Sequence, residues 1–139
     1  RSDSVIKLIH RERIYYEHTD STEFVYHTNY LKFMERARTE WLDSLGFSQR
    51  ALKQKHNIFF VVKTAKINYI KPAKLDDKLL LTIRKLVMKK ASLLIKQDIA
   101  LEEEQIICQG VFVLSCVSSM SSTPVKIPEQ ILLAISNVS

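Results

Sequence analysis

Glycine is scarce in this sequence, with Gly46 and Gly110 the only two among 139 residues. Loops that cradle nucleotide phosphates need several glycines at fixed spacing, so P-loops and dinucleotide-binding loops are excluded. Cysteine is equally scarce: Cys108 and Cys116 lie in one predicted strand, roughly 26 Å apart, whereas a disulfide needs about 4.4 to 6.8 Å between α-carbons. Two cysteines cannot supply the four ligands of a structural zinc site. We therefore predict no disulfide and no metal site, and expect both thiols in apolar packing.

Long apolar runs are absent as well. No segment approaches the roughly 18 to 20 apolar residues that cross a membrane, and residues 1–4 are not the start of a signal peptide. We expect a soluble, cytoplasmic protein without a transmembrane segment. Apolar residues make up 46% and charged residues 26% of the chain, as in folded globular domains. Two domains would each be too small to bury a core, so residues 1–139 are predicted to form one domain.

The strongest helical pattern covers residues 31–45. Apolar residues recur there every three or four positions, which predicts a helix with one buried stripe made of Leu31, Met34, Ala37, Trp41, Leu42 and Leu45. Asn29 is the expected N-cap, and Gly46 stands where a left-handed residue ends many helices. Ser48 is expected to cap a short second helix. Pro128 suits the first turn of a terminal helix.

Strands are predicted over residues 5–16, 58–71, 79–86, 93–102 and 106–117. In the second of these, one face is expected to carry Val61, Ala65, Ile67 and Tyr69. In the fourth, alternation predicts a buried face and a solvent-facing side that carries Lys96, Asp98 and Glu102. The last strand is apolar almost throughout, which indicates cover on both faces.

These elements predict an α+β fold in which one long helix packs against a five-stranded antiparallel sheet. One principal helix covers one side of such a sheet. The other side is expected to meet solvent or another copy of the chain.

The segment between the first strand and the long helix is rich in groups that can transfer protons. It leads into a helix N-terminus, where free N–H groups and the helix dipole favour developing negative charge. Asp20, ionised at neutral pH, could attack a carbonyl or activate a water there, while backbone N–H groups near His27 hold an oxyanion. This combination suits acyl transfer.

Composition alone also allows a structural interpretation of these residues. Asp and Thr are common in loops because their side chains satisfy local backbone groups. His18 and His27, taken singly, are more often surface or packing histidines than catalysts. Asp76 and Asp77 are typical of a turn rather than of an acid–base pair.

Several separated motifs favour the catalytic interpretation. They occur in the order Tyr15-Tyr-Glu-His-Thr-Asp20, Val25-Tyr-His27, Asn29-Tyr30 and Glu35-Arg-Ala-Arg-Thr-Glu40. Further matches follow at residues 47–49, 60–62, 69–77 and 127–128. In this combination the chain resembles the hot dog fold acyl-CoA thioesterases of the hydroxybenzoyl-CoA thioesterase type, and most closely the branch associated with the bacterial Tol-Pal system.

The resemblance implies a long central helix wrapped by a curved five-stranded antiparallel sheet, with two copies joined edge to edge and active sites at their interface. It implies hydrolysis of an acyl-CoA to free acid and CoA. Asp20 takes the place of the catalytic carboxylate, acting as nucleophile or general base. His27 takes the place at the N-terminus of the central helix, with its backbone N–H as oxyanion donor. No cofactor is expected, because coenzyme A is part of the substrate.

The loop departs from the family pattern D-T-D-x-x-G-V-V-Y-H at three positions. His18 replaces the first Asp, Glu23 stands in place of Gly, and Phe24 replaces the first Val. A backbone conformation that suits glycine costs another residue roughly 1 to 2 kcal/mol. These changes indicate either a rerouted loop or weaker turnover.

Positive charge is concentrated in residues 61–100, which hold ten Lys and Arg against three Asp, a net charge of +7, while the whole chain carries +6. Coenzyme A is polyanionic, and a lysine cluster attracts such a ligand. By the resemblance, Lys89 and Lys90 stand at the strand turn that meets the nucleotide. The alternative is a solvated lysine-rich surface.

The sequence therefore predicts an acyl-CoA thioesterase that works as a homodimer or homotetramer. The alternative is a protein of the same fold that binds acyl-CoA or a protein partner without turnover. A related dehydratase activity fits the loop less well. Nucleic-acid binding is the weakest interpretation, because the basic residues lack interleaved aromatic residues and no duplex-reading motif is present.

Overall fold

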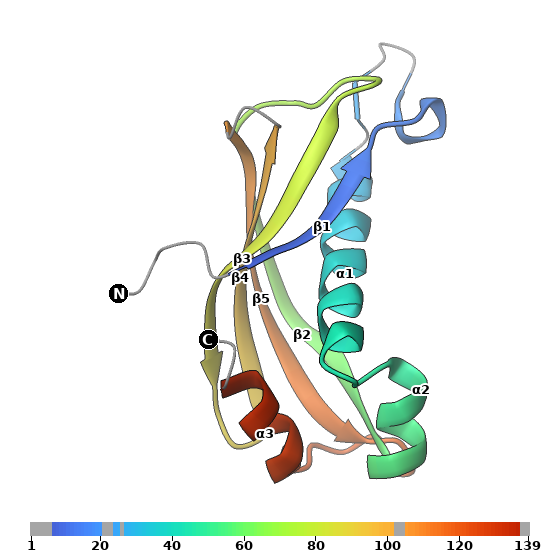
Figure 1. Cartoon of the computed structure of the whole chain (residues 1–139), viewed down its shortest axis with the longest axis vertical. Helices are drawn as coiled ribbons and strands as arrows, with labels where there is room; N and C mark the ends of the chain where they lie inside the picture. Colours follow the sequence, from blue (N-terminus) through green and yellow to red (C-terminus); the bar gives the residue numbers. More distant parts are fainter. Residues whose placement is uncertain (1–6, 21–23, 26, 102–104, 137–139) are drawn as a thin grey trace.

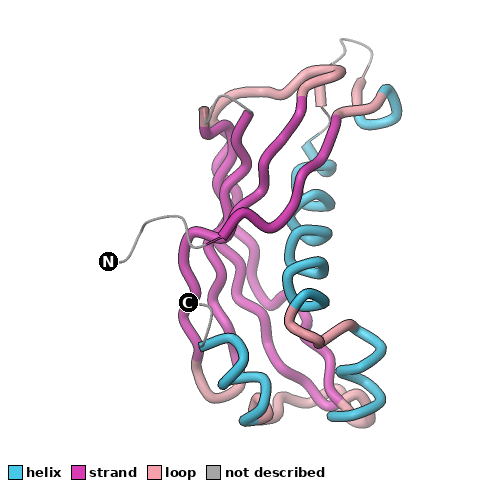
Figure 2. The backbone as a smooth tube through the Cα atoms, viewed as in Figure 1, coloured by secondary structure: helices cyan, strands magenta, loops and turns pink. Residues whose placement is uncertain are grey.

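The computed structural model describes residues 7–20, 24–25, 27–101 and 105–136. A curved sheet wraps around one long helix, as the backbone traces in Figures 1 and 2 show. The strands are β1 (Lys7–Arg13), β2 (Ile58–Tyr69), β3 (Lys78–Met88), β4 (Ser92–Leu101) and β5 (Ile106–Ser118). The helices are α1 (His27–Ser44), α2 (Gln49–Ala51) and α3 (Glu129–Ser136), with a 3-10 turn η1 (Tyr16–His18) and a π-helical segment η2 (Leu52–His56).

The sheet is antiparallel throughout, in the order β1-β3-β4-β5-β2. Although β2 and β3 follow one another in the chain, β2 pairs with β5 and lies at one edge, while β3 pairs with β1 and β4. The predicted α+β architecture of one long helix and five antiparallel strands is confirmed.

The first strand is shorter than predicted. It ends at Arg13 rather than at residue 16, because the chain turns at η1, where the His18 N–H donates to the Tyr15 carbonyl (2.9 Å) and the Tyr15 N–H donates to His18 Nδ1 (3.0 Å). The two first residues of the predicted strand lie outside the described residues.

Helix α1 begins earlier than predicted, so Asn29 as its N-cap is wrong. Asn29 lies inside the first turn, where its side-chain amide donates to the His18 carbonyl (2.9 Å). The predicted end is confirmed: Gly46 is left-handed (φ +92°), and the Phe47 N–H donates back to the Leu42 carbonyl (2.9 Å). Ser48 caps α2 by accepting from the Ala51 N–H, as predicted.

A β-bulge changes the faces of β2. Val62 pairs with Leu114 and Thr64 pairs with Val113, so Lys63 is an extra residue. Because successive residues of a strand point to opposite faces, one extra residue reverses the alternation beyond it. The prediction that Val61 shares a face with Ala65 is therefore wrong.

The solvent-facing side predicted for β4 is also wrong at Asp98. This carboxylate is only 3% exposed and accepts from Arg84 Nε at 3.2 and 3.3 Å. Residue 102, predicted on the same side, lies outside the described residues. A buried charge needs a charged partner, and Arg84 on the neighbouring strand supplies it.

The core lies between α1 and the concave face of the sheet. Met34 and Trp41 are buried there, and both cysteines are free and buried, as predicted. Gly110 on β5 faces Met34, since a Cβ built at Gly110 would lie 2.7 Å from the Met34 sulfur. No helix in the described part of the chain is long and apolar enough to cross a membrane.

Candidate active site

The chain folds back on itself immediately before α1. Thr19 forms an antiparallel bridge with Val25, and the Asp20 N–H donates to the Phe24 carbonyl (2.9 Å). Phe24 in turn bridges Lys74. This pairing places Asp20, which is exposed, beside the segment that enters the helix. Glu23, which is expected to reroute the loop or weaken turnover, lies outside the described residues.

His27 is the first residue of α1. The N–H groups of the first turn of a helix have no acceptor within the helix, so they are available to an incoming oxygen. The predicted catalytic residues, Asp20 and His27, therefore stand on the two sides of one short loop.

His18 packs against α1 and holds the loop before it. Its side chain is 6% exposed and its ring packs edge-on against Phe33, with centroids 5.0 Å apart. Its carbonyl accepts from the Asn29 side chain and its Nδ1 accepts from the Tyr15 N–H. Of the two interpretations of His18, packing is the one that the structure supports.

Tyr30 ties the first turn of α1 to the loop that enters β3. Its hydroxyl accepts from the Ala73 N–H (2.9 Å), and the Ala73 carbonyl accepts from the Val25 N–H (3.0 Å). Its ring meets Tyr69 edge-on at 5.4 Å. Burial raises the pKa of Tyr30, so the hydroxyl stays protonated at neutral pH. Sequence analysis names Tyr30 within a motif but predicts no role for its hydroxyl, because the partner lies 43 positions away.

Lys89 and Lys90 occupy the turn between β3 and β4 and are exposed. Within one chain they lie far from Asp20: the Phe24–Lys74 bridge holds the loop before α1 near the start of β3, and the lysines follow the end of β3 (Figure 1). Eleven strand residues span roughly 35 Å. The four predicted site residues are thus not brought together by one copy of the chain.

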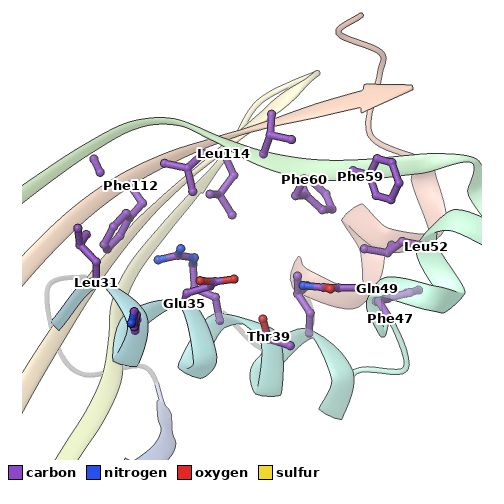
Figure 3. A pocket seen from close by; sticks show the side chains of 16 residues that line it. Leu31, Glu35, Thr39, Phe47, Gln49, Leu52, Phe59, Phe60, Phe112 and Leu114 are labelled. Atoms are coloured by element: carbon purple, nitrogen blue, oxygen red, sulfur yellow. The ribbon is translucent and has the colours of Figure 1, made fainter. Parts of the chain in front are cut away.

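A groove of about 690 Å³ runs between α1 and the edge strand β2 (Figure 3). Its strand-side wall is apolar and includes Phe59, Phe60, Phe112 and Leu114. Its helix-side wall is more polar and includes Glu35, Arg38 and Thr39. Leu31, predicted in the buried stripe, is 38% exposed and lines this groove instead. The sequence did not reveal the groove, because β2 and α1 meet only in the folded chain.

The groove starts close to the loop that precedes α1. Leu31 lies four residues after His27, which is about one helical turn. From there the groove follows α1 to Leu42 and Phe47. An extended apolar group whose reactive end lies at the N-terminus of α1 can therefore lie along it. The described residues contain no cluster of three or more metal-ligating side chains.

A family model for the thioesterase superfamily matches residues 22–108, which include His27, all of α1 and strands β2, β3 and β4. The chain belongs to the thioesterase superfamily. It is 38% identical over 122 residues to an acyl-CoA thioesterase YbgC of Haemophilus influenzae, covering 88% of this chain and 89% of that protein. It is 37% identical over 120 residues to an acyl-CoA thioester hydrolase YbgC of Escherichia coli O6:H1, covering 86% of this chain and 89% of that protein.

A solved structure supports the same family. The probable thioesterase from Bartonella henselae matches with a TM-score of 0.79 and 28% identity, over 86% of this chain and 97% of that one. The thioesterase superfamily fold, the hot dog fold, is thereby confirmed, and the protein is an enzyme of the thioester hydrolase class. The narrower resemblances, to the hydroxybenzoyl-CoA type and to the Tol-Pal branch, stay predictions.

Proposed function

We propose that this protein hydrolyses acyl-CoA thioesters to a free acid and CoA, with Asp20 as the catalytic carboxylate. The observation that supports the proposal is the hydrogen bond from the Asp20 N–H to the carbonyl of Phe24, three residues before α1 begins. The acyl-CoA substrate is that of the two YbgC relatives. The cytoplasmic location expected from the sequence is part of this proposal.

The proposed reaction uses one water molecule. Its oxygen bonds to the thioester carbonyl carbon, and the negative charge that develops on the carbonyl oxygen is stabilised by the N–H groups of the first turn of α1, including that of His27. The carbon–sulfur bond then breaks, and CoA leaves as a thiolate that takes up a proton. As a general base, Asp20 removes the proton from this attacking water. As a nucleophile, Asp20 instead attacks the thioester carbon first, CoA leaves as the thiolate, and the water then hydrolyses the resulting mixed anhydride to the free acid and Asp20.

A second copy of the chain is part of the proposal. Strand β2 forms an edge of the sheet and carries exposed apolar side chains, Phe59, Val61, Val62 and Tyr69 among them. An exposed apolar edge strand favours pairing with another strand. If two copies pair antiparallel along β2, the Lys89 and Lys90 end of one copy comes to the same end of the assembly as Asp20 of the other. The lysines can then attract the CoA phosphates, as a dimer or within a tetramer.

Thiol release from short, long and aromatic acyl-CoAs, measured for the parent and for Asp20→Asn, tests the proposal. We expect Asp20→Asn to lower kcat by about 100-fold or more, because a positioned acid–base group contributes about 10² to 10⁴ in rate. Asp76→Asn is the matched control, since Asp76 lies in an exposed turn and pairs with Arg13. Equal rates in Asp20→Asn and the parent would remove Asp20 from the mechanism.

The alternative function is binding without turnover. It is favoured by Phe24, which is 40% exposed and pairs with Asp20, at a position where the family pattern that this loop resembles has the smaller Val. Saturable binding of acyl-CoA without thiol release, at every chain length, would establish this alternative and exclude the first.

A further inference from the structure

Arg38 is a buried cation in the wall of the groove. It is 7% exposed, and its Nη1 donates to Gln97 Oε1 (2.9 Å), while Gln97 Nε2 donates to the Met34 carbonyl (3.1 Å). Its guanidinium lies 4.2 Å from the centre of the Phe112 ring. A neutral amide and an aromatic face therefore hold this charge in place.

Arg38 has donors that these contacts do not use. A guanidinium has five N–H donors, and the bond to Gln97 is the one hydrogen bond that Arg38 makes within the described part of the chain. No buried side-chain nitrogen or oxygen among the described residues lacks a hydrogen-bond partner. The guanidinium nitrogens of Arg38 that make no hydrogen bond are therefore accessible to solvent. They face the groove, because Arg38 is one of the residues that line it.

No carboxylate lies within ion-pair distance of Arg38 in the described residues. Glu35 is close enough to act through its field, but it is exposed, and burial lowers the pKa of Arg38 to about 10 in spite of it. A buried charge without a counter-charge is costly. An anion that enters the groove would therefore be strongly favoured beside Arg38.

The distance from the reacting carbonyl sets the length of such a ligand. Arg38 lies eleven residues after His27, or about 16 Å along the helix. Helical side chains lean toward the N-terminus, which brings the guanidinium back by about one turn, or about 5 Å. With carbon–carbon bonds of about 1.5 Å in a zigzag chain, the remaining gap of about 11 Å corresponds to an acyl chain of about eight to ten carbons.

We propose that Arg38 is a specificity-determining residue that binds the distal carboxylate of a medium-chain dicarboxylic acyl group lying in the groove. This inference rests on the proposed function, which places the thioester at the N-terminus of α1. A guanidinium binds a carboxylate through two parallel hydrogen bonds. The repulsion from Glu35 is weakened by water because Glu35 is exposed, whereas the attraction to buried Arg38 is not.

The test compares the CoA thioesters of a ten-carbon diacid, sebacoyl-CoA, and of the matching monoacid, decanoyl-CoA. We expect the parent to prefer sebacoyl-CoA in kcat/KM by about 10-fold or more, and Arg38→Met to lower this ratio by about 30-fold. Arg38→Lys should keep part of the preference, because it keeps the charge and loses the two-pronged geometry. Arg36→Met is the control: Arg36 is exposed on the same helix, pairs with Glu12 and leaves the ratio unchanged.

The inference would be overturned if the parent had equal kcat/KM values for sebacoyl-CoA and decanoyl-CoA. It would also be overturned if Arg38→Met lowered both kcat/KM values by the same factor. Should Arg38→Met not fold, Glu35→Gln replaces it. Removing the negative charge of Glu35 removes its repulsion of the distal carboxylate. The ratio of kcat/KM for sebacoyl-CoA to that for decanoyl-CoA should therefore rise by about two- to five-fold, and an unchanged ratio counts against the inference. Calorimetric titration with free sebacate and with decanol, which has the same chain length and no carboxylate, applies even if no thiol is released. Sebacate should bind the parent more tightly than decanol, and equal binding would overturn the inference independently of catalysis.

Discussion

Gly110 and Met34 are in direct van der Waals contact across the interface of sheet and helix. A Cβ at Gly110 would lie 2.7 Å from the Met34 sulfur and 2.7 Å from a ring carbon of Phe112. Contacts this short do not occur between unstrained atoms, so the absence of a side chain at Gly110 is what lets α1 approach β5 at this point.

Gly110→Ala should therefore lower the free energy of unfolding by about 1 to 3 kcal/mol, the usual cost of an added methyl group in a packed core. Urea titration of the variant and the parent measures it. In a Met34→Ala background the same change should cost less, because part of the clash is gone. Equal costs in both backgrounds would show that Met34 is not the opposing group.

Tyr30→Phe should lower the free energy of unfolding by about 1 to 3 kcal/mol, because it leaves the buried Ala73 N–H without its acceptor. Hydrogen exchange at residues 70–77 should accelerate with it, since this loop loses its tie to α1. Tyr16→Phe is the control: Tyr16 is 77% exposed and should change neither quantity. Unchanged exchange in Tyr30→Phe would contradict the proposed role of the hydroxyl.

The buried thiols should make stability fall between pH 9 and pH 10. Burial raises the pKa of Cys108 to about 12, with a further contribution from Asp98, and raises the pKa of Cys116 to about 11, from an ordinary value of 9.0. Above pH 9 the unfolded state therefore loses thiol protons that the folded state keeps, and stability falls, by at most about 1.4 kcal/mol per pH unit for each thiol. Below pH 9 both states keep them and the contribution is constant.

Denaturant titrations at pH 8, 9 and 10 measure this loss. In Cys108→Ala/Cys116→Ala the decline should be shallower than in the parent. Burial lowers the pKa of Arg38 to about 10, so its loss of a proton in the folded state begins to act near pH 10, with the opposite sign. The parent and the double variant both carry Arg38, so this contribution cancels in their comparison. Parallel curves for the two proteins would show that the thiols do not contribute.

Val61→Lys should shift the protein toward the monomer, because Val61 is 43% exposed on the edge strand through which two copies are proposed to pair. Sedimentation velocity measures the shift, and kcat/KM for acyl-CoA should fall with it, because the proposed site takes Lys89 and Lys90 from a second copy. Leu133→Lys is the control, as Leu133 is 56% exposed on α3. An unchanged dimer in Val61→Lys would place the interface elsewhere.

Local patterns predicted the elements of this fold well. The end of α1 at Gly46, the Ser48 cap and the buried cysteines were all predicted correctly, since each depends on residues close in sequence. The errors have a different origin. Asn29 has the chemistry of a cap, but its amide is used by His18 eleven positions away, and the extra residue in β2 is visible only in its pairing with β5.

By itself, the sequence determined the class of the fold and the long helix, because periodicity is a property of neighbouring residues. A contiguous motif also made Asp20 and His27 the candidate catalytic residues, and this assignment stays a prediction. The tertiary structure alone decided three other features. It separated Lys89 and Lys90 from Asp20 by the length of β3, opened a groove between α1 and β2, and buried Arg38 in its wall. Each of these depends on how far apart two distant segments lie after the sheet curls around the helix, and no local pattern encodes that distance.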